Sequence, residues 1–177
     1  MSILDPSVEN TNLITKSTVS IKVDSLSIQK ILVLVDGTET SFRAANYAVN
    51  LAKLVNAELI PINIIEDVKQ GGAIGLLAKY GKMSIVNAFK MARRHSAEGW
   101  LKEIEDEAWT LKVRVKSVIL DSDGRNEEKM LSEYAMENNI DLIVVGSKGG
   151  SRFLGLGAGG FTKSILHHST KPVLVVH

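Results

Sequence analysis

Glycine is concentrated in one stretch near the C-terminus whose residue types suit the binding of phosphate. Seven of the chain's 14 glycines lie between Gly146 and Gly160. Glycine costs backbone entropy on folding, so this density predicts a backbone that approaches a ligand closely with its N–H groups turned outward. Phosphate is the commonest such ligand, because it accepts many hydrogen bonds and is favoured at the N-terminus of a helix. A surface loop without a ligand is the alternative.

The segments on either side of these glycines are those that a phosphate site requires. Residues 141–145, DLIVV, predict a buried strand, and a helix is expected from about 161 to 168. In this strand, loop and helix, backbone N–H groups would hold the phosphates, with added charge from basic side chains and hydrogen bonds from hydroxyls. The backbone groups lie around Ser147, Gly149, Gly159, Gly160, Phe161 and Thr162, the charges are those of Lys148 and Arg152, and the hydroxyls are those of Ser147 and Thr162.

Two common phosphate motifs do not account for the glycines. The pattern GxxxxGK[ST] has no match in the chain. The pattern GxGxxG matches Gly155, Gly157 and Gly160, but a dinucleotide fingerprint directly follows its strand and has an acidic residue about 20 residues further on. Here the match begins ten residues after Val145, and too little chain follows it to supply that acid. We therefore interpret this match as accidental.

The pattern G-x2-G-x9-G fits better, at Gly146, Gly149 and Gly159. It follows an apolar strand and precedes a helix and the run KPVLVV, and in this context it resembles the nucleotide loop of the universal stress protein family. Residues 31–53, ILVLVDGTETSFRAANYAVNLAK, resemble the first strand and helix of that family. The resemblance covers residues 28–177. It implies an ATP-binding stress-response or signalling module with a Rossmann-like, adenine nucleotide alpha hydrolase-like fold.

The resemblance also implies roles for residues outside the glycine-rich stretch. Asp36 would accept hydrogen bonds from the ribose hydroxyls. Leu34, Val35 and Ile64 match positions that wall the adenine pocket, where Ile64 would offer its backbone groups to the base, and Val145 would lie at the edge of the same pocket. Mg²⁺ would accompany the phosphates, as such anionic ligands usually require. The family further implies a homodimer formed through the C-terminal strand, whose short apolar edge favours pairing.

One residue departs from the family pattern. Serine or threonine usually follows the last glycine of the motif, and this chain has Gly160 there. Losing one neutral hydrogen bond costs about 0.5–1.5 kcal/mol, or up to about tenfold in affinity. A second interpretation therefore stays open: a family member that has lost nucleotide binding and acts as a dimeric interaction or chaperone-like protein. No catalytic group can be named, so an enzyme of related architecture is a third class, and slow ATP hydrolysis is the most that we expect.

Composition restricts the other possibilities. A chain of 177 residues with 45% hydrophobic and 23% charged residues is typical of one ordinary globular domain. The net charge of +1 gives no reason to expect a nucleic-acid partner. The absence of cysteine excludes disulfides, thiolate metal ligands and a cysteine nucleophile. No secretory signal or membrane-spanning run is recognised, so we expect a cytoplasmic protein. Residues 1–27 are interpreted as an extension, partly disordered or adding an edge strand.

Strands alternate with helices along the rest of the chain. We expect strands at 31–35, 59–65, 111–120, 141–145 and 173–176, helices at 40–55, 84–109, 127–137 and 161–168, and an irregular or partly helical excursion at 67–83. This order predicts an α/β fold: a five-stranded parallel, doubly wound sheet with helices on both faces. Ligands bind such sheets at the carboxyl ends of the strands. Asp36 and Gly146 would share that crevice if the first and fourth strands are neighbours, as the resemblance implies. Pro61 predicts an edge position or a bulge in the second strand.

Several side chains also have simpler explanations. Asp36 is a possible phosphoacceptor of a receiver domain, but the acidic pair that such domains carry after the first strand is missing. It is also a possible helix cap. The basic run Arg93, Arg94 and His95 is interpreted as a solvated helix face. Trp100 and Trp109 are interpreted as packing residues.

Overall fold

The computed structural model of the chain describes residues 27–67, 72–147 and 160–177. The described strands form one parallel sheet of five, in the order β3-β2-β1-β4-β5. The strands are β1 (Lys30–Leu34), β2 (Glu58–Ile65), β3 (Val118–Asp121), β4 (Leu142–Gly146) and β5 (Val173–Val176). The helices are α1 (Glu39–Val55), α2 (Gly72–Lys79), α3 (Met83–Thr110), α4 (Glu127–Glu137) and α5 (Gly160–His168). The expected extension at residues 1–26 lies outside the described residues.

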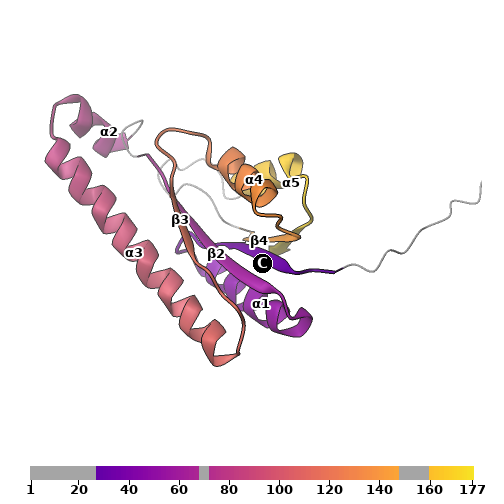
Figure 1. The fold of residues 1–177 in the computed structure, drawn as a ribbon. Helices are drawn as coiled ribbons and strands as arrows, with labels where there is room; N and C mark the ends of the chain where they lie inside the picture. The colour runs from indigo at the N-terminus through magenta and orange to yellow at the C-terminus, as the bar shows by residue number, and fades with distance from the viewer. Residues whose placement is uncertain (1–26, 68–71, 148–159) are drawn as a thin grey trace, which may run out of the picture.

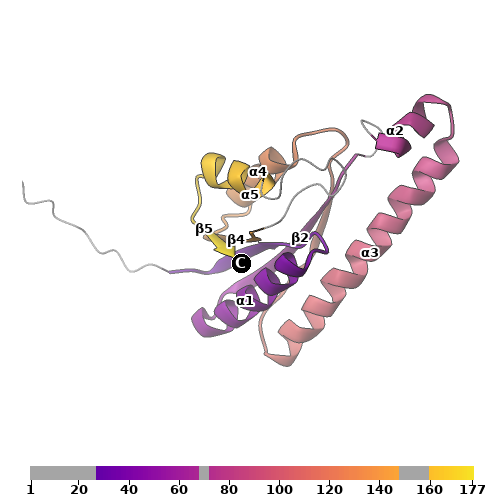
Figure 2. The same cartoon turned by 180° about the vertical axis from the view of Figure 1, so that it is seen from behind.

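The helices cover both faces of the sheet (Figures 1 and 2). Alternate residues of β1 divide between two cores: Ile31 and Val33 pack with α1 and α3, whereas Leu32 and Leu34 pack with α4 and α5. A central parallel strand is buried on both faces, which explains its unbroken apolar sequence. The predicted five-stranded, doubly wound α/β fold is confirmed. β1 and β4 are paired neighbours, so the ends of these two strands do meet at one edge of the sheet.

The first turn of α1 packs closely on the end of β4. Thr38 is the N-cap of α1, and its hydroxyl accepts a hydrogen bond from the Ser41 N–H at 3.2 Å. A Cβ built on Gly146 would lie 2.7 Å from the backbone carbonyl carbon of Thr40. No side chain fits in this space, so the first glycine of the motif is needed for helix and strand to approach each other.

The third strand is shorter than the sequence predicts. Helix α3 continues to Thr110, and β3 begins only at Val118. Lys112 has a φ of 61°, which ends the helix, and Val113 then packs into the core at 8% exposure. The connection makes one isolated bridge to β2, at Val115. The apolar alternation that predicted a strand at 111–120 therefore partly reflects a buried connection.

Pro61 lies in an interior strand, because β2 pairs with both β1 and β3. The Leu59 N–H donates to Arg114 on the β3 side, so Pro61, two residues further on, faces the same side. On the β3 side, Leu59 pairs with Val115, and regular pairing resumes at Ile62 with Val118. The residues of β2 between these two points have no partner there. The register is the same on both sides of this gap, so no residue is inserted. The edge and bulge predictions are both wrong: a local gap in the ladder accommodates the missing N–H.

The excursion at 67–83 contains a helix, α2, which lies against the end of α3 away from the sheet (Figure 1). Among the described residues, no helix has the length and apolar character needed to cross a membrane.

Candidate functional site

A cavity of about 410 Å³ lies at the carboxyl ends of β1 and β2, between α3 on one face and α4 and α5 on the other. Its volume is in the range of small-molecule sites. Four predicted site residues line it together: Leu34, Asp36, Ile64 and Phe161. The remaining lining residues are Asn63, Ile65 and Glu66 from the end of β2, Phe89, Ala92, Arg93, Ser96 and Trp100 from α3, and Glu127 from α4.

Asp36 is held in place by the turn that precedes α1. Its carboxylate oxygen Oδ1 accepts hydrogen bonds from the Thr38 N–H at 3.0 Å and the Thr38 hydroxyl at 2.6 Å. Its own N–H donates to the Ser41 hydroxyl at 3.3 Å. Thr38, and not Asp36, is the N-cap of the helix. The carboxylate thus has a fixed position beside the cavity, at the point where β1 ends.

Two predicted residues lie in the core instead of on the wall of the cavity. Val35 is 0% exposed and packs on the α1 and α3 side, and Val145 is 1% exposed and packs on the other side. Their side chains have no surface to offer a ligand. In contrast to the prediction, the side chain of Val35 does not wall the cavity, because it points into the core beneath α1 and α3.

Two donors predicted to contact phosphate are used inside the fold. The Thr162 hydroxyl donates to the Gly146 carbonyl at 2.9 Å, and Thr162 is 4% exposed. The Ser147 N–H donates to the Val176 carbonyl at 2.7 Å. Both groups are already hydrogen-bonded within the fold. They join α5 to β4 and β4 to β5, and so position the two ends of the glycine-rich segment.

Helix α5 begins beside the cavity. Gly160 is its first residue, and a Cβ built there would meet nothing within 4 Å. Phe161 follows and lines the cavity while remaining 8% exposed. The predicted phosphate residues Lys148, Gly149, Arg152 and Gly159 lie outside the described residues.

The contribution of α3 was missed by sequence analysis. Its lining residues recur at three- and four-residue spacing and form one face of the helix. Trp100 also lies against Gly37: a Cβ on that glycine, whose φ is 77°, would lie 2.3 Å from the indole ring. The indole makes an edge contact with Phe42, with 6.3 Å between ring centroids. Trp100 is thus both a packing residue, as predicted, and a wall of the cavity. The same prediction is wrong for Trp109, which is 77% exposed.

Charged groups gather at the end of the cavity that is nearest α4. Arg93 Nη1 lies 3.4 Å from Glu66 Oε2. Burial, and then repulsion by Glu66 and Glu128, raise the pKa of Glu127 to about 7, although Arg93 acts in the opposite direction. Arg93 follows Phe89 by about one helical turn. Nothing local in the sequence indicates that this part of α3 borders two carboxylates.

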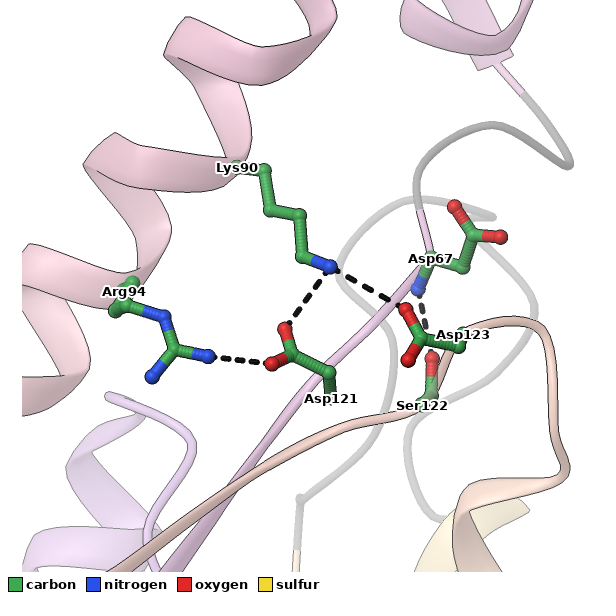
Figure 3. Close-up of polar contacts among 6 residues, drawn as sticks. All are labelled: Asp67, Lys90, Arg94, Asp121, Ser122 and Asp123. Carbon is green, nitrogen blue, oxygen red and sulfur yellow. Dashed lines mark hydrogen bonds and ion pairs between the residues drawn. The ribbon is translucent and has the colours of Figure 1, made fainter.

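A second group of charges fixes α3 to the end of β3 (Figure 3). Lys90 Nζ lies 3.1 Å from Asp121 and 3.3 Å from Asp123, and Arg94 lies 2.5 Å from Asp121. The interpretation of the basic run as a solvated face is therefore wrong for Arg93 and Arg94, and it holds for His95, whose side chain is 92% exposed.

Within the described ranges, no group of three or more histidine, aspartate or glutamate side chains could hold a metal ion.

A doubly wound parallel sheet whose strand order reverses between β1 and β4, with a cavity at the carboxyl ends of β1 and β2, is the arrangement of Rossmann-like proteins. The sequence profile of the Universal stress protein family matches residues 27–177, and the chain belongs to that family.

Individual relatives agree with this assignment. Universal stress protein MJ0531 of Methanocaldococcus jannaschii is 28% identical over 148 residues, which cover 84% of this chain and 81% of the relative. The universal stress protein UspA from Lactobacillus plantarum has the same fold, with a TM-score of 0.69 and 22% identity over 85% of this chain and 98% of that chain.

Two further solved structures with this fold are described with adenine nucleotides. One is a universal stress protein in complex with cAMP, with a TM-score of 0.55 and 22% identity over 85% of this chain and 98% of that chain. The other is the universal stress protein from Archaeoglobus fulgidus in complex with dAMP, with a TM-score of 0.57 and 11% identity over 86% of this chain and 99% of that chain.

Proposed function

We propose that this chain is an ATP-binding module of the universal stress protein family that acts in stress response or signalling. The observation that carries the proposal is the cavity at the strand ends, which brings Leu34, Asp36, Ile64 and Phe161 together beside the start of α5. The adenine nucleotides described for two structures of the same fold support this class of ligand.

The residues present suit the parts of the nucleotide. Leu34, Ile64 and Phe161 give the apolar surface that a base requires, and Asp36 supplies a carboxylate for the ribose hydroxyls. The N-terminus of α5 favours the phosphates through its N–H groups and its dipole. Mg²⁺ would be bound mainly by the phosphate oxygens, because the described side chains form no cluster for it.

A second candidate is a dimeric interaction protein that has lost the nucleotide. Gly160 lacks the hydroxyl of the family motif, and the Thr162 hydroxyl is already donated to Gly146. Strand β5 is at one edge of the described sheet, where its outer backbone groups favour pairing with a second copy. We propose a homodimer through β5 in both cases, so dimerisation does not distinguish the two functions.

Calorimetric titration of ATP with Mg²⁺ tests the site. Asp36→Asn removes the negative charge but keeps a side-chain oxygen that can accept the hydrogen bonds from Thr38. Hydrogen bonds to charged groups contribute about 1.5–3 kcal/mol, so we expect this variant to bind ATP at least about tenfold more weakly. Asp106→Asn is the matched control, because Asp106 pairs only with its helical neighbour Lys102 on the exposed face of α3 among the contacts described. Equal ATP affinity of the two variants would contradict the assignment of Asp36.

A further inference from the structure

Helix α2 and the first turn of α3 form an end of the molecule that projects beyond the sheet (Figures 1 and 2). Gly81, whose φ is 72°, lies in the short turn between the two helices, and the Lys82 N–H donates to the Leu77 carbonyl at 2.9 Å. Helix α2 packs against α3. Residues 73–85, which comprise α2, this turn and the start of α3, are called the tip.

Large apolar side chains are exposed on the tip. Leu76 and Tyr80 lie one helical turn apart, with the Tyr80 N–H donating to the Leu76 carbonyl at 3.1 Å, and they are 56% and 74% exposed. Met83 and Ile85 in the first turn of α3 are also exposed, whereas Val86 beside them is buried. Several large apolar side chains exposed together mark an interaction surface.

The charge of this part of the chain has one sign. Residues 72–97 contain five lysines and arginines and no aspartate or glutamate. Three of the five, Lys90, Arg93 and Arg94, are paired with acidic side chains of other elements. Lys79 and Lys82 are exposed, and neither forms an ion pair with any residue that the structure describes. The tip therefore combines exposed apolar side chains with uncompensated positive charge.

We propose that the tip docks on an anionic membrane surface. Leu76, Tyr80 and Met83 would enter the boundary between headgroups and acyl chains, where apolar side chains are buried and tyrosine is enriched. Lys79 and Lys82 would reach the lipid phosphates while their alkyl stems stay in the apolar layer. The tip would lie on the membrane and not cross it, in agreement with the absence of a membrane-crossing helix among the described residues.

The combination of side chains favours a lipid surface over other anionic partners. A nucleic acid would be held by the lysines, but the aliphatic side chains of Leu76 and Met83 gain little from a phosphate backbone. A protein partner must supply a groove of matching shape, whereas a bilayer deforms around a projecting group. The inference goes beyond nucleotide binding, because Leu76, Lys79 and Lys82 are not among the residues that line the cavity.

Co-sedimentation of the whole chain with lipid vesicles tests the charge. One set of vesicles is phosphatidylcholine alone, and the other is phosphatidylcholine and phosphatidylglycerol in equal parts. We expect binding to the anionic vesicles that high salt weakens, and much weaker binding to the neutral ones. A lysine near an anionic surface contributes about fivefold in affinity, so the double variant Lys79→Gln, Lys82→Gln should bind about thirtyfold more weakly.

The matched control for charge is the double variant Lys112→Gln, Lys116→Gln. It removes the same charge from exposed residues beyond the C-terminal end of α3, far from the tip, and should bind the anionic vesicles as the wild type does. Equal losses of binding in the two double variants would show that net charge alone attracts the protein, and would overturn the inference.

The apolar contact is tested at Leu76. Burying a leucine side chain contributes about tenfold or more in affinity, so Leu76→Gln should weaken binding to anionic vesicles by that factor. Leu166→Gln is the matched control, because Leu166 on α5 is similarly exposed, at 52%, and should not contact the membrane. Unchanged binding of Leu76→Gln would contradict the docking of the tip.

A fluorescent probe shows directly which part of the protein meets the lipid. The chain has no cysteine, so an environment-sensitive dye attached to Leu76→Cys reports on one site. Its fluorescence should rise with anionic vesicles, and that of the same dye on Thr110→Cys, at the other end of α3, should not.

Two results would overturn the lipid assignment. The first is the absence of binding to anionic vesicles. The second is a smaller mass of Leu76→Gln than of Leu166→Gln in sedimentation equilibrium, which would assign the tip to pairing with a second copy. Both results would leave the ATP site standing, since ATP binding is measured without lipid.

Discussion

The close approach of α1 to β4 predicts that Gly146→Ala destabilises the fold and weakens the ligand site together. The added Cβ would lie 2.7 Å from the Thr40 carbonyl carbon, 2.8 Å from its oxygen and 2.9 Å from the Ser41 nitrogen. All three are backbone atoms, so no side chain can rotate away, and the first turn of α1 must move. The φ of Gly146 is not among the positive values of the described glycines, so the strain comes from this contact and not from backbone conformation.

Overpacking of this kind costs about 1–3 kcal/mol. For a chain of this size, each kcal/mol lowers the melting temperature by about 2–4 °C, so we expect a loss of about 2–12 °C. ATP affinity should fall as well, because the turn that moves contains Thr38, which holds the Asp36 carboxylate.

Thermal and urea unfolding followed by circular dichroism measure the first effect, and calorimetry measures the second. Gly99→Ala is the matched control: a Cβ there meets nothing within 4 Å, and the residue lies inside α3. Alanine is favoured over glycine in helices by about 0.5–1 kcal/mol, so this control should be as stable as the wild type or more stable. If Gly146→Ala were as stable as Gly99→Ala, the argument that β4 and α1 require a glycine would be refuted.

Three further predictions concern Gly160, Thr162 and Glu127. Gly160→Ser restores the hydroxyl of the family motif at a position with open space, and calorimetry should show ATP affinity increased up to about tenfold; no increase would mean that this position does not contact phosphate. Thr162→Val removes the bond to the buried Gly146 carbonyl and should lower the free energy of unfolding in urea by about 1–3 kcal/mol, whereas an unchanged value would show that the bond contributes nothing. The pKa of Glu127 is raised from 4.5 to about 7, so its contribution to stability is complete below about pH 4.5 and is lost as the pH rises through 7. Glu127→Gln should therefore be more stable than the wild type by about 1–3 kcal/mol near pH 8 and not near pH 4.5, and equal differences in urea unfolding at both pH values would contradict the raised pKa.

The layered fold could be predicted from the sequence because its signals are local. Apolar runs such as the one containing Ile31 and Val33 mark strands that are buried on both faces, and helical periodicity marks the segments between them. The pairing of β1 with β4 followed from the family resemblance, since the order of strands in a sheet is not written in any local pattern.

The candidate site was predicted only in part because its remaining groups depend on tertiary contacts. Asp36 and Ile64 were expected from the family resemblance, but the wall formed by α3 lies far along the chain. The use of the Thr162 hydroxyl by Gly146 depends on how α5 docks on β4, which no sequence pattern specifies.

The central claim is most directly tested by thermal unfolding of the whole chain with and without ATP–Mg²⁺, with GTP–Mg²⁺ as the comparison. At 100 times its dissociation constant, a ligand that binds only the folded state stabilises it by about 2.7 kcal/mol, which corresponds to about 5–11 °C for a chain of this size. We predict a shift of this order with ATP and a smaller one with GTP. No shift at millimolar ATP would contradict the nucleotide site and favour the interaction protein instead.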